Sequence, residues 1–229
     1  MKIAVLFRGP LRPSAADTRR YVSNFMQNFE CLGILPTTYL ATWCPSTVDA
    51  DVSALIEQDM DNVIALSMPT DDFIGPDVCE AIVPSGHRGR SMFYQHFMSK
   101  MAIDLITSRE EYDIIVHTRT DLRIEFGNMF PRWFALDRRE QYQTMHTRDP
   151  FFPEAHVNDQ FAIAPPAMMQ QAWDYKTLQN LRTKIIQVAA AGGKAEDVLQ
   201  HLLDEAGITA VPGPVVTYAL DAQRHHAGR

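Results

Sequence analysis

Hydrophobic and polar positions along the chain follow two alternating patterns. Short apolar runs rich in Ile, Val and Leu are typical of buried strands, whereas longer stretches with apolar residues every three to four positions are typical of amphipathic helices. The predicted strands are 2–7, 36–43, 62–67, 112–124, 141–145, 161–164, 208–211 and 215–220. The predicted helices are 17–29, 52–59, 92–108, 166–187 and 195–206. This alternation predicts an α/β fold, and the lack of repeats or linkers predicts one domain.

The longest predicted strand, 112–124, carries the most informative polar residues. After an Ile-Ile-Val run it places His117, Arg119, Asp121 and Arg123 at alternate positions. Side chains alternate between the two faces of a strand, so these four are expected on one face. A carboxylate at the end of an apolar strand is costly unless it meets a cation, a metal or water. We therefore expect the strand to end at a polar cleft, where α/β proteins bind ligands.

The first predicted strand leads into Arg-Gly-Pro-Leu-Arg at 8–12. Gly9 would let a ligand approach the backbone, and Arg8 and Arg12 could meet its negative charge. A tight turn with two surface arginines is equally compatible with these residues. The segment lacks the glycine pattern of dinucleotide-binding loops, which argues against NAD and FAD. Trp43 ends the second strand, where it could stack on a base or cap the core.

A second basic segment, 84–91, precedes the predicted helix 92–108. Ser91 is suited to be the N-cap, which would place Arg88 and Arg90 beside the helix N-terminus. Backbone N–H groups at a helix N-terminus favour an anion, so a diphosphate is the obvious candidate. The alternative is a basic loop that binds no ligand.

Two aspartates at strand ends form a candidate catalytic pair. Three consecutive polar residues at 158–160 directly precede a predicted strand, and Asp159 is the middle one. In an α/β fold Asp121 and Asp159 could face one cleft, where one anchors a metal-bound diphosphate and the other removes a proton from an attacking hydroxyl. Alternatively, Asp121 pairs with Arg119 or Arg123, and Asp159 caps a turn.

Composition and charge narrow the class of protein. The net charge of −7 argues against a general nucleic-acid binder. No apolar run reaches the roughly 18 residues of a membrane helix, which leaves only peripheral membrane association. The three cysteines are odd in number and lack CxxC spacing, so neither a disulfide framework nor a zinc site is predicted. This cysteine usage predicts a cytoplasmic protein.

The order of these motifs resembles that of small glycosyltransferases of the GT-A type, in particular the WavE-like proteins of lipopolysaccharide and capsule synthesis. The resemblance covers nearly the whole chain. The matching segments are 8–12, 42–43, the helix with Tyr94, Gln95 and Lys100, 112–123, 158–163 and the helix that opens at 195–197. It implies a single GT-A-like, Rossmann-like domain with a mixed, mostly parallel central sheet flanked by helices. It also implies a donor half at 1–125, an acceptor half at 126–220 and a tail at 221–229.

The resemblance implies transfer of a hexosyl or related sugar, an activity of the EC 2.4 type. The donor would be a nucleotide-diphosphate sugar, and the acceptor a hydroxyl of a glycan or lipopolysaccharide. By position, Asp121 would be the aspartate of the Asp-x-Asp-like motif that holds the donor and a divalent metal, Mn²⁺ or Mg²⁺. Two residues earlier stands Arg119 instead of aspartate, which leaves metal dependence open, because a guanidinium can itself neutralise a diphosphate. Asp159 would be the acceptor-side base in an inverting reaction.

The resemblance and the local chemistry together give a set of candidate site residues. The predicted donor-binding residues are Arg8, Gly9, Arg12, Thr42, Trp43, Arg88, Arg90, Tyr94, Gln95 and Arg119. The predicted acceptor-binding residues are Asn158 and Glu196, although Glu196 could simply stabilise the helix dipole. Two other functions fit the same residues: a sugar nucleotidyltransferase, and a degenerate nucleotide-sugar-binding module, which the missing first aspartate favours.

Overall fold

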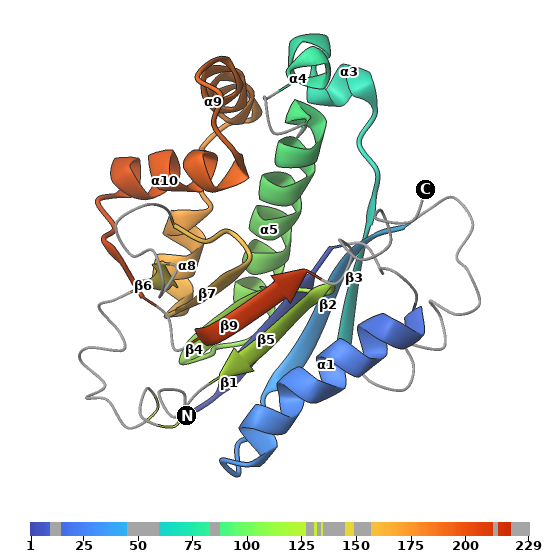
Figure 1. The fold of residues 1–229 in the computed structure, drawn as a ribbon, viewed down its shortest axis with the longest axis vertical. Helices are drawn as coiled ribbons and strands as arrows, with labels where there is room; N and C mark the ends of the chain where they lie inside the picture. The colour runs from blue at the N-terminus through green and yellow to red at the C-terminus, as the bar shows by residue number, and fades with distance from the viewer. Residues whose placement is uncertain are drawn as a thin grey trace.

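The computed structural model of the chain describes residues 1–9, 15–44, 60–82, 88–126, 131, 134, 145–148, 157–212 and 215–220. Its centre is a seven-stranded sheet with the strand order β3-β2-β1-β4-β7-β6-β8 (Figure 1). The strands are β1 (Ile3–Arg8), β2 (Thr37–Cys44), β3 (Asn62–Ser67), β4 (Ile114–Arg119), β6 (Met145–Arg148), β7 (Phe161–Ala164) and β8 (Ala210–Pro212). β1 to β4 run parallel, β7 is antiparallel to β4 and β6, and β8 is parallel to β6. The predicted α/β domain with a mixed, mostly parallel sheet is confirmed.

The prediction of one long strand at 112–124 is wrong, because this segment forms two strands in two sheets. β4 ends at Arg119, level with Arg8 at the end of its neighbour β1. The chain then turns at 120–121, where the backbone N–H of Thr120 donates to the carbonyl oxygen of Arg8 at 3.0 Å. β5 (Leu122–Phe126) pairs antiparallel with β9 (Val215–Leu220) in a separate two-stranded sheet. The charged residues therefore lie at a corner of the chain and not along one strand face.

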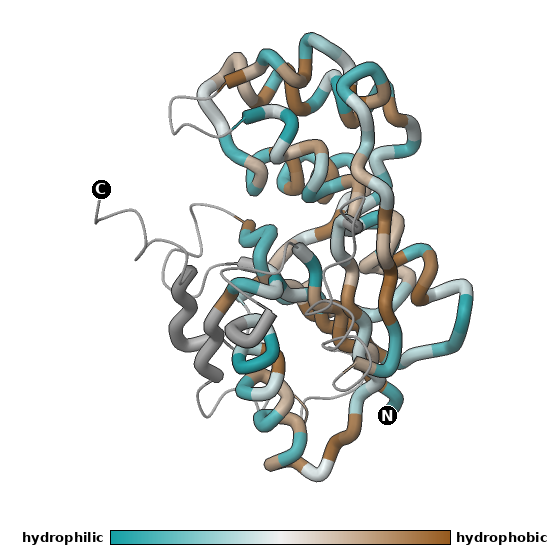
Figure 2. The backbone as a smooth tube through the Cα atoms, turned by 90° about the vertical axis from the view of Figure 1, so that its right-hand side faces the viewer, coloured by the Kyte–Doolittle hydropathy of each residue, from teal (hydrophilic) through white to brown (hydrophobic). Residues whose placement is uncertain are grey.

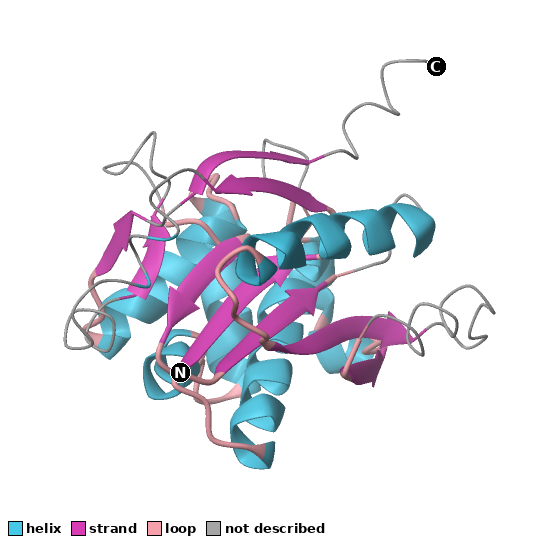
Figure 3. Cartoon of the chain, turned by 90° about the horizontal axis from the view of Figure 1, so that it is seen from below, coloured by secondary structure: helices cyan, strands magenta, loops and turns pink. Residues whose placement is uncertain are grey.

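Helices cover both faces of the sheet (Figure 3). They are α1 (Ala15–Glu30), α3 (Asp71–Ile74), α4 (Pro76–Glu80), α5 (Gly89–Arg109), α8 (Pro166–Ala172), α9 (Leu178–Ala190) and α10 (Ala195–Ala206). The predicted single helix at 166–187 is in fact α8 and α9, because Trp173 ends α8 and the side chain of Thr177 caps α9. The predicted helix 52–59 and residues 141–144 of a predicted strand lie outside the described residues.

The alternation of side chains along β1 explains why the sheet is buried on both faces. Its odd-numbered residues pack with α1 in one cluster: Ile3, Val5, Phe7, Val22, Phe25 and Phe29. Its even-numbered apolar residues face α5 and α10 in another cluster: Ala4, Leu6, Met98, Ala102, Ile103, Leu199 and Leu203. Figure 2 shows the hydrophobic stretches of the strands inside the molecule. Because a strand buried on both faces has no room for charge, the polar residues of β1 and β4 come at their ends.

The start of α5 is fixed by close packing on α4. The prediction that Ser91 caps this helix is wrong, because α5 begins at Gly89 with Arg88 as its N-cap. A Cβ atom on Gly89 would lie 2.3 Å from the backbone oxygen of Val78 and 3.3 Å from Ile185 of α9. The absence of a side chain at this position therefore lets α4, α5 and α9 pack closely together at the start of α5.

We expect Gly89→Ala to lower the free energy of unfolding by about 1–3 kcal/mol, because the added methyl group overpacks a rigid backbone contact. Ser91→Ala is the matched control, since Ser91 is an exposed residue of the same helix turn and should change stability by less than about 0.5 kcal/mol. Urea unfolding of the three proteins measures the difference. Equal stability of all three would contradict the close packing described here.

Candidate functional site

The ends of β1 and β4 bring together charged residues that are far apart in the sequence. Arg8 closes β1, Arg119 closes β4, and Asp121 follows at the turn. Asp159 stands two residues before β7, the strand paired with β4 on its other side. Arg8, Asp121 and Asp159 are all almost completely buried. Both Asp121 and Asp159 act electrostatically on Arg8, so the two carboxylates lie near the same end of β1, and their role as a pair facing one cleft stays a prediction.

Arg8 makes the deepest contacts of this group. Its Nε donates to Nε2 of His117 at 2.9 Å, and its Nη2 donates to the backbone oxygen of Asp159 at 2.6 Å and to Oδ2 of Asp159 at 3.2 Å. Burial lowers the pKa of Arg8, and the positive charge of Arg119 adds to that, while Asp159 opposes it. The guanidinium stays charged at any physiological pH, so the structure has to supply these acceptors to keep it buried.

His117 accepts the hydrogen bond from Arg8 and must be neutral to do so. Burial and the positive charge of Arg8 place its pKa well below the ordinary value of 6.5. Its ring also lies 4.7 Å from that of Trp173, centroid to centroid, and Oγ of Ser99 lies 3.2 Å from the same Nε2. A fixed, neutral imidazole thus orients the Arg8 side chain by accepting its hydrogen bond.

Arg119 and Asp121 form a two-point ion pair. Nε and Nη2 of Arg119 donate to Oδ1 and Oδ2 of Asp121, both at 2.7 Å. Burial lowers the pKa of Arg119, but the hydrogen bond and charge of Asp121 outweigh it, so its pKa is raised overall. Of the two interpretations of Asp121 from the sequence, pairing with Arg119 is what the structure shows.

The residues around Asp121 do not fit a bound divalent cation. Both of its carboxylate oxygens already accept from Arg119, which also brings a positive charge to the position a metal would take. Within the part of the chain that the structure describes, no group of three His, Cys, Asp or Glu side chains is placed to hold a metal ion. Mn²⁺ and Mg²⁺ bind mainly through oxygen ligands, and among the described residues Arg119 already occupies both carboxylate oxygens of Asp121.

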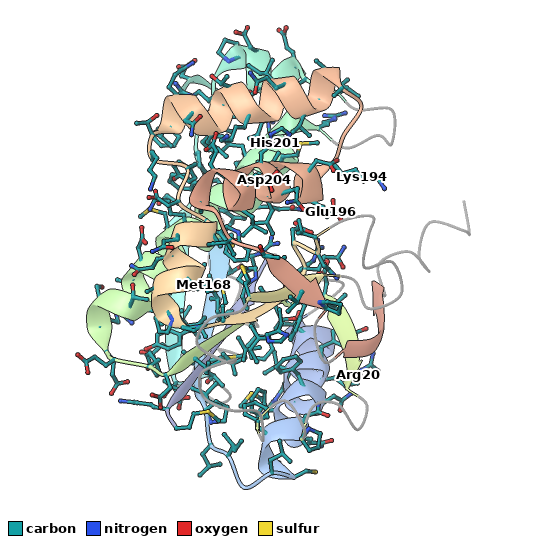
Figure 4. All side chains as sticks on the ribbon, turned by 90° about the vertical axis from the view of Figure 1, so that its left-hand side faces the viewer. Arg20, Met168, Lys194, Glu196, His201 and Asp204 are labelled. Carbon is teal, nitrogen blue, oxygen red and sulfur yellow. The ribbon has the colours of Figure 1, made fainter. Side chains whose placement is uncertain are left out.

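Glu196 adds a third carboxylate from another element. It lies in the first turn of α10, at the same end of the helix as Lys194 (Figure 4). Burial raises its pKa, and so does the negative charge of Asp159, which shows that the two carboxylates are close enough to interact. The capping bond at this helix end comes from Asp197, whose carboxylate accepts from the backbone N–H of Lys194 at 2.6 Å. Glu196 is therefore not required as the cap.

These five residues, Arg8, Arg119, Asp121, Asp159 and Glu196, are called the charged cluster below. Electrostatic effects between them link every member: Arg8 with Arg119 and Asp121, Arg119 with Asp159 and Glu196, and Glu196 with Asp159. The cluster contains two permanent cations and three carboxyl groups, one of which is more easily protonated than usual. Such an arrangement can bind an anion at the guanidiniums and exchange a proton at the carboxylates.

Four other predicted donor-binding residues lie on β2 and α5. Trp43, at the end of β2, packs against Tyr94 with ring centroids 5.1 Å apart and is nearly parallel to Phe97 at 6.4 Å. Thr42 is buried in β2. Gln95, on α5, has a buried side-chain oxygen without a hydrogen-bond partner among the described residues. The structure thus places Trp43 in an aromatic group, which is the core-packing alternative for this residue.

The two arginines at the start of α5 do not join the charged cluster. Arg90 donates to Oδ2 of Asp71 on α3 at 2.6 Å, and Arg88 is an exposed N-cap that makes no side-chain capping bond. The hydrogen bond to Cys79 and the charge of Asp71 raise the pKa of Arg90. The predicted donor contacts of these two residues stay predictions, and Arg12 lies outside the described residues.

Gly9 and Asn158 shape the backbone around the cluster. Gly9 has a φ of +126°, which L side chains rarely adopt, and a Cβ there would lie 3.1 Å from Oγ1 of Thr120. Oδ1 of Asn158 accepts from the backbone N–H of Gln160 at 2.8 Å and so holds the turn that carries Asp159. The side chain of Asn158 has a structural role that the prediction of an acceptor contact did not include.

His96 is a buried site residue that sequence reasoning missed. It lies on α5, and its Nε2 is 3.1 Å from the backbone oxygen of Ala195, which ties the start of α10 to α5. Its Nδ1 has no hydrogen-bond partner among the described residues. Burial lowers its pKa to about 4, with Arg8 adding to the shift and Asp159 opposing it. Only its position on the sheet-facing side of a predicted helix could have suggested this role.

Comparisons with solved structures place the fold. The galactosyltransferase LgtC, in complex with donor and acceptor sugar analogs, is 10% identical, with 92% of this chain and 73% of that chain covered and a TM-score of 0.53. An active-site mutant of LgtC gives 10% identity, coverages of 92% and 72%, and a TM-score of 0.52. Mouse xyloside xylosyltransferase 1 is 11% identical, with coverages of 93% and 85% and a TM-score of 0.49.

The fold is therefore that of the GT-A glycosyltransferases, whose members LgtC represents here. No family model matches the sequence, and no curated protein matches it significantly. The narrower WavE-like assignment stays a prediction. Among the helices that the structure describes, none has the length and apolar character needed to span a membrane.

We expect stability to fall with acidification through His96. The unfolded chain binds a proton there near the ordinary pKa of 6.5, whereas the folded chain binds it only near 4. The contribution of neutral His96 to the free energy of unfolding is therefore at its maximum above about pH 6.5, and it is lost as the pH falls toward 4. Between pH 7.5 and 4.5 the loss from this residue should be about 2–3 kcal/mol.

Urea unfolding of the wild type and His96→Gln at both pH values tests this. Gln keeps an N–H donor for the Ala195 oxygen but does not titrate, so the variant should lose less stability on acidification than the wild type. His201→Gln, at an exposed position of α10, is the matched control and should behave like the wild type. The same loss in wild type and His96→Gln would show that His96 is not a buried neutral base.

Proposed function

We propose that this protein is a glycosyltransferase that moves a sugar from a nucleotide-diphosphate sugar to a hydroxyl of a glycan or lipopolysaccharide-type acceptor. One observation carries the proposal: the charged cluster lies at the carboxyl ends of β1 and β4 in a GT-A fold. Ligands of open α/β sheets bind at that edge. Both the guanidiniums that a diphosphate needs and the carboxylates that a hydroxyl needs are present there.

The finer parts of the proposal rest on the sequence. The resemblance to WavE-like proteins supports lipopolysaccharide or capsule synthesis and transfer of a hexosyl or related sugar. Residues 1–125 would bind the donor and 126–220 the acceptor. The unpaired cysteines Cys31 and Cys79 are compatible with the proposed cytoplasmic location.

The proposed reaction divides the cluster into two ends. At the donor end, Arg119 and Arg8 attract the diphosphate, and Asp121 holds Arg119 in position. At the acceptor end, the acceptor oxygen attacks the anomeric carbon while the bond from that carbon to the diphosphate oxygen breaks. In an inverting transfer the hydroxyl proton passes to a carboxylate, and we assign that role to Asp159.

We assign to Glu196 the role of orienting the acceptor beside Asp159. It is only partly buried, whereas Asp159 is almost completely buried and bonds to Arg8 through one carboxylate oxygen. Among the described residues Oδ1 of Asp159 makes no hydrogen bond, so we assign this atom to the acceptor. Burial and the negative charge of Asp159 raise the pKa of Glu196, so Glu196 takes up a proton more readily than an exposed glutamate.

Variants of the two aspartates should separate transfer from donor binding. Asp159→Asn should lower the rate of transfer by about 10²–10⁴-fold and change donor affinity much less, because the base is lost while the amide oxygen of Asn and the backbone oxygen of residue 159 can still accept from Arg8. Asp121→Asn should weaken donor affinity by about 10–100-fold, because Arg119 loses the charged acceptor that positions it. Isothermal titration with nucleotide sugars and mass spectrometry of a glycan acceptor measure the two effects.

Asp204→Asn is the matched control, because Asp204 is exposed on α10 and its side chain bonds only to Gln200 among the described residues. It should transfer and bind like the wild type. The opposite pattern for the two aspartates would exchange their roles, and loss of transfer in Glu196→Gln but not in Asp159→Asn would make Glu196 the base. If no nucleotide sugar binds, the proposed function fails.

A degenerate nucleotide-sugar-binding module is the second candidate. The observation that favours it is Arg119 at the position where the GT-A resemblance leads one to expect a carboxylate. Such a module would bind a nucleotide sugar and neither transfer nor hydrolyse it. Product formation at a rate that Asp159→Asn abolishes would exclude it.

A further inference from the structure

We propose that Arg119 takes the place of a divalent metal ion, so that the protein binds the diphosphate of its donor through guanidinium groups alone. The inference rests on the proposed function and adds to it the means of recognising the donor. Three features of the charged cluster carry it: the donors that Arg119 leaves unused, the position of its charge, and its rigid attachment to the sheet.

Arg119 has hydrogen-bond donors that its pairing with Asp121 leaves unused. Only Nε and one N–H of Nη2 are needed for Asp121, and no bond from Nη1 is found among the described residues. The side chain of Arg119 is 17% exposed, whereas that of Asp121 is 4% exposed. The pair therefore buries its carboxylate and presents its guanidinium, which is the polarity that a phosphate requires.

The positive charge beside Asp121 also favours a phosphate over a metal ion at this position. Arg8 lies close enough to Arg119 for the positive charge of Arg119 to lower the pKa of Arg8, in addition to the effect of burial. A divalent cation at Asp121 would have to approach both guanidiniums and displace a two-point hydrogen bond. A diphosphate oxygen at Arg119 would instead relieve the repulsion between the two arginines.

Arg119 is held in place before any ligand arrives. It is the last residue of β4 and lies in register with Arg8 of β1, and the next backbone N–H, that of Thr120, bonds to the Arg8 oxygen. Asp121 fixes the far end of its side chain at two points. A guanidinium with so little freedom loses little conformational entropy when it binds an anion. A metal ion held in a rigid site has the same advantage, because its positive charge is already in position.

Isothermal titration of the wild-type protein with UDP, GDP, ADP and CDP, each in excess EDTA and each with Mn²⁺, tests the inference. At least one nucleotide should bind, with a Kd in EDTA within about threefold of that in Mn²⁺. Binding that needs Mn²⁺ would overturn the inference and leave the proposed function standing. If none of the four binds in either condition, the proposed function fails, and the inference fails with it.

Two substitutions at Arg119 locate the effect. Arg119→Gln removes the charge and should weaken binding in EDTA by at least about 100-fold, whereas Arg119→Lys keeps a charge beside Asp121 without the fork and should weaken it by about tenfold. Arg109→Gln is the matched control at the other end of the sheet, where Arg109 is an exposed residue in the last turn of α5. Melting temperatures confirm that each variant is folded. Wild-type affinity in folded Arg119→Lys and Arg119→Gln would overturn the inference.

Discussion

The buried ion pair between Arg8 and Asp159 is the interaction on which this site depends. Arg8 is a permanent cation at the end of a strand that is apolar on both faces, and burial of such a charge is unfavourable unless it is fully paired. The pairing draws on β4, through His117, and on the segment before β7, through Asp159. Removal of one partner from a buried pair of this kind typically costs about 3–5 kcal/mol. The requirement to pair Arg8 therefore joins β1 to two segments that lie more than a hundred residues further along the chain.

The same pair explains how the sheet can be both a core and a site. Along β1 and β4 no position before the last carries a permanent charge, because the residues are apolar or, like His117 and Thr118, polar and neutral, so the charges gather at one edge. His117 can sit under Arg8 only as a neutral imidazole, which burial and the charge of Arg8 together ensure. The Arg119–Asp121 pair then stands at the same edge and offers a guanidinium to a ligand. The structure thus relates a folding requirement to the chemistry of the proposed reaction.

The sequence predicted most of the elements and the edge at which the charges meet. β3, β7, α10 and β9 have the predicted bounds, because periodicity and the adjoining Gly and Pro residues define them locally. The turn at 120–121 was missed because an alternating pattern does not show that β4 has lost its neighbour β1 beyond Arg119. The pairing of Arg90 with Asp71 and the role of His96 were missed for a similar reason, since both depend on helices that meet only in the folded chain. Local pattern predicts elements, whereas tertiary packing decides partners.

In the proposed mechanism, Arg119 recognises the donor at the position where the GT-A resemblance leads one to expect a second carboxylate. The most direct test is a crystal structure of the protein with a nucleoside diphosphate that it binds, grown in EDTA. The account predicts the diphosphate within hydrogen-bond distance of the Arg119 guanidinium, next to the Arg8–Asp159 pair. A diphosphate bound at Arg88 and Arg90 instead, with the charged cluster empty, would contradict it.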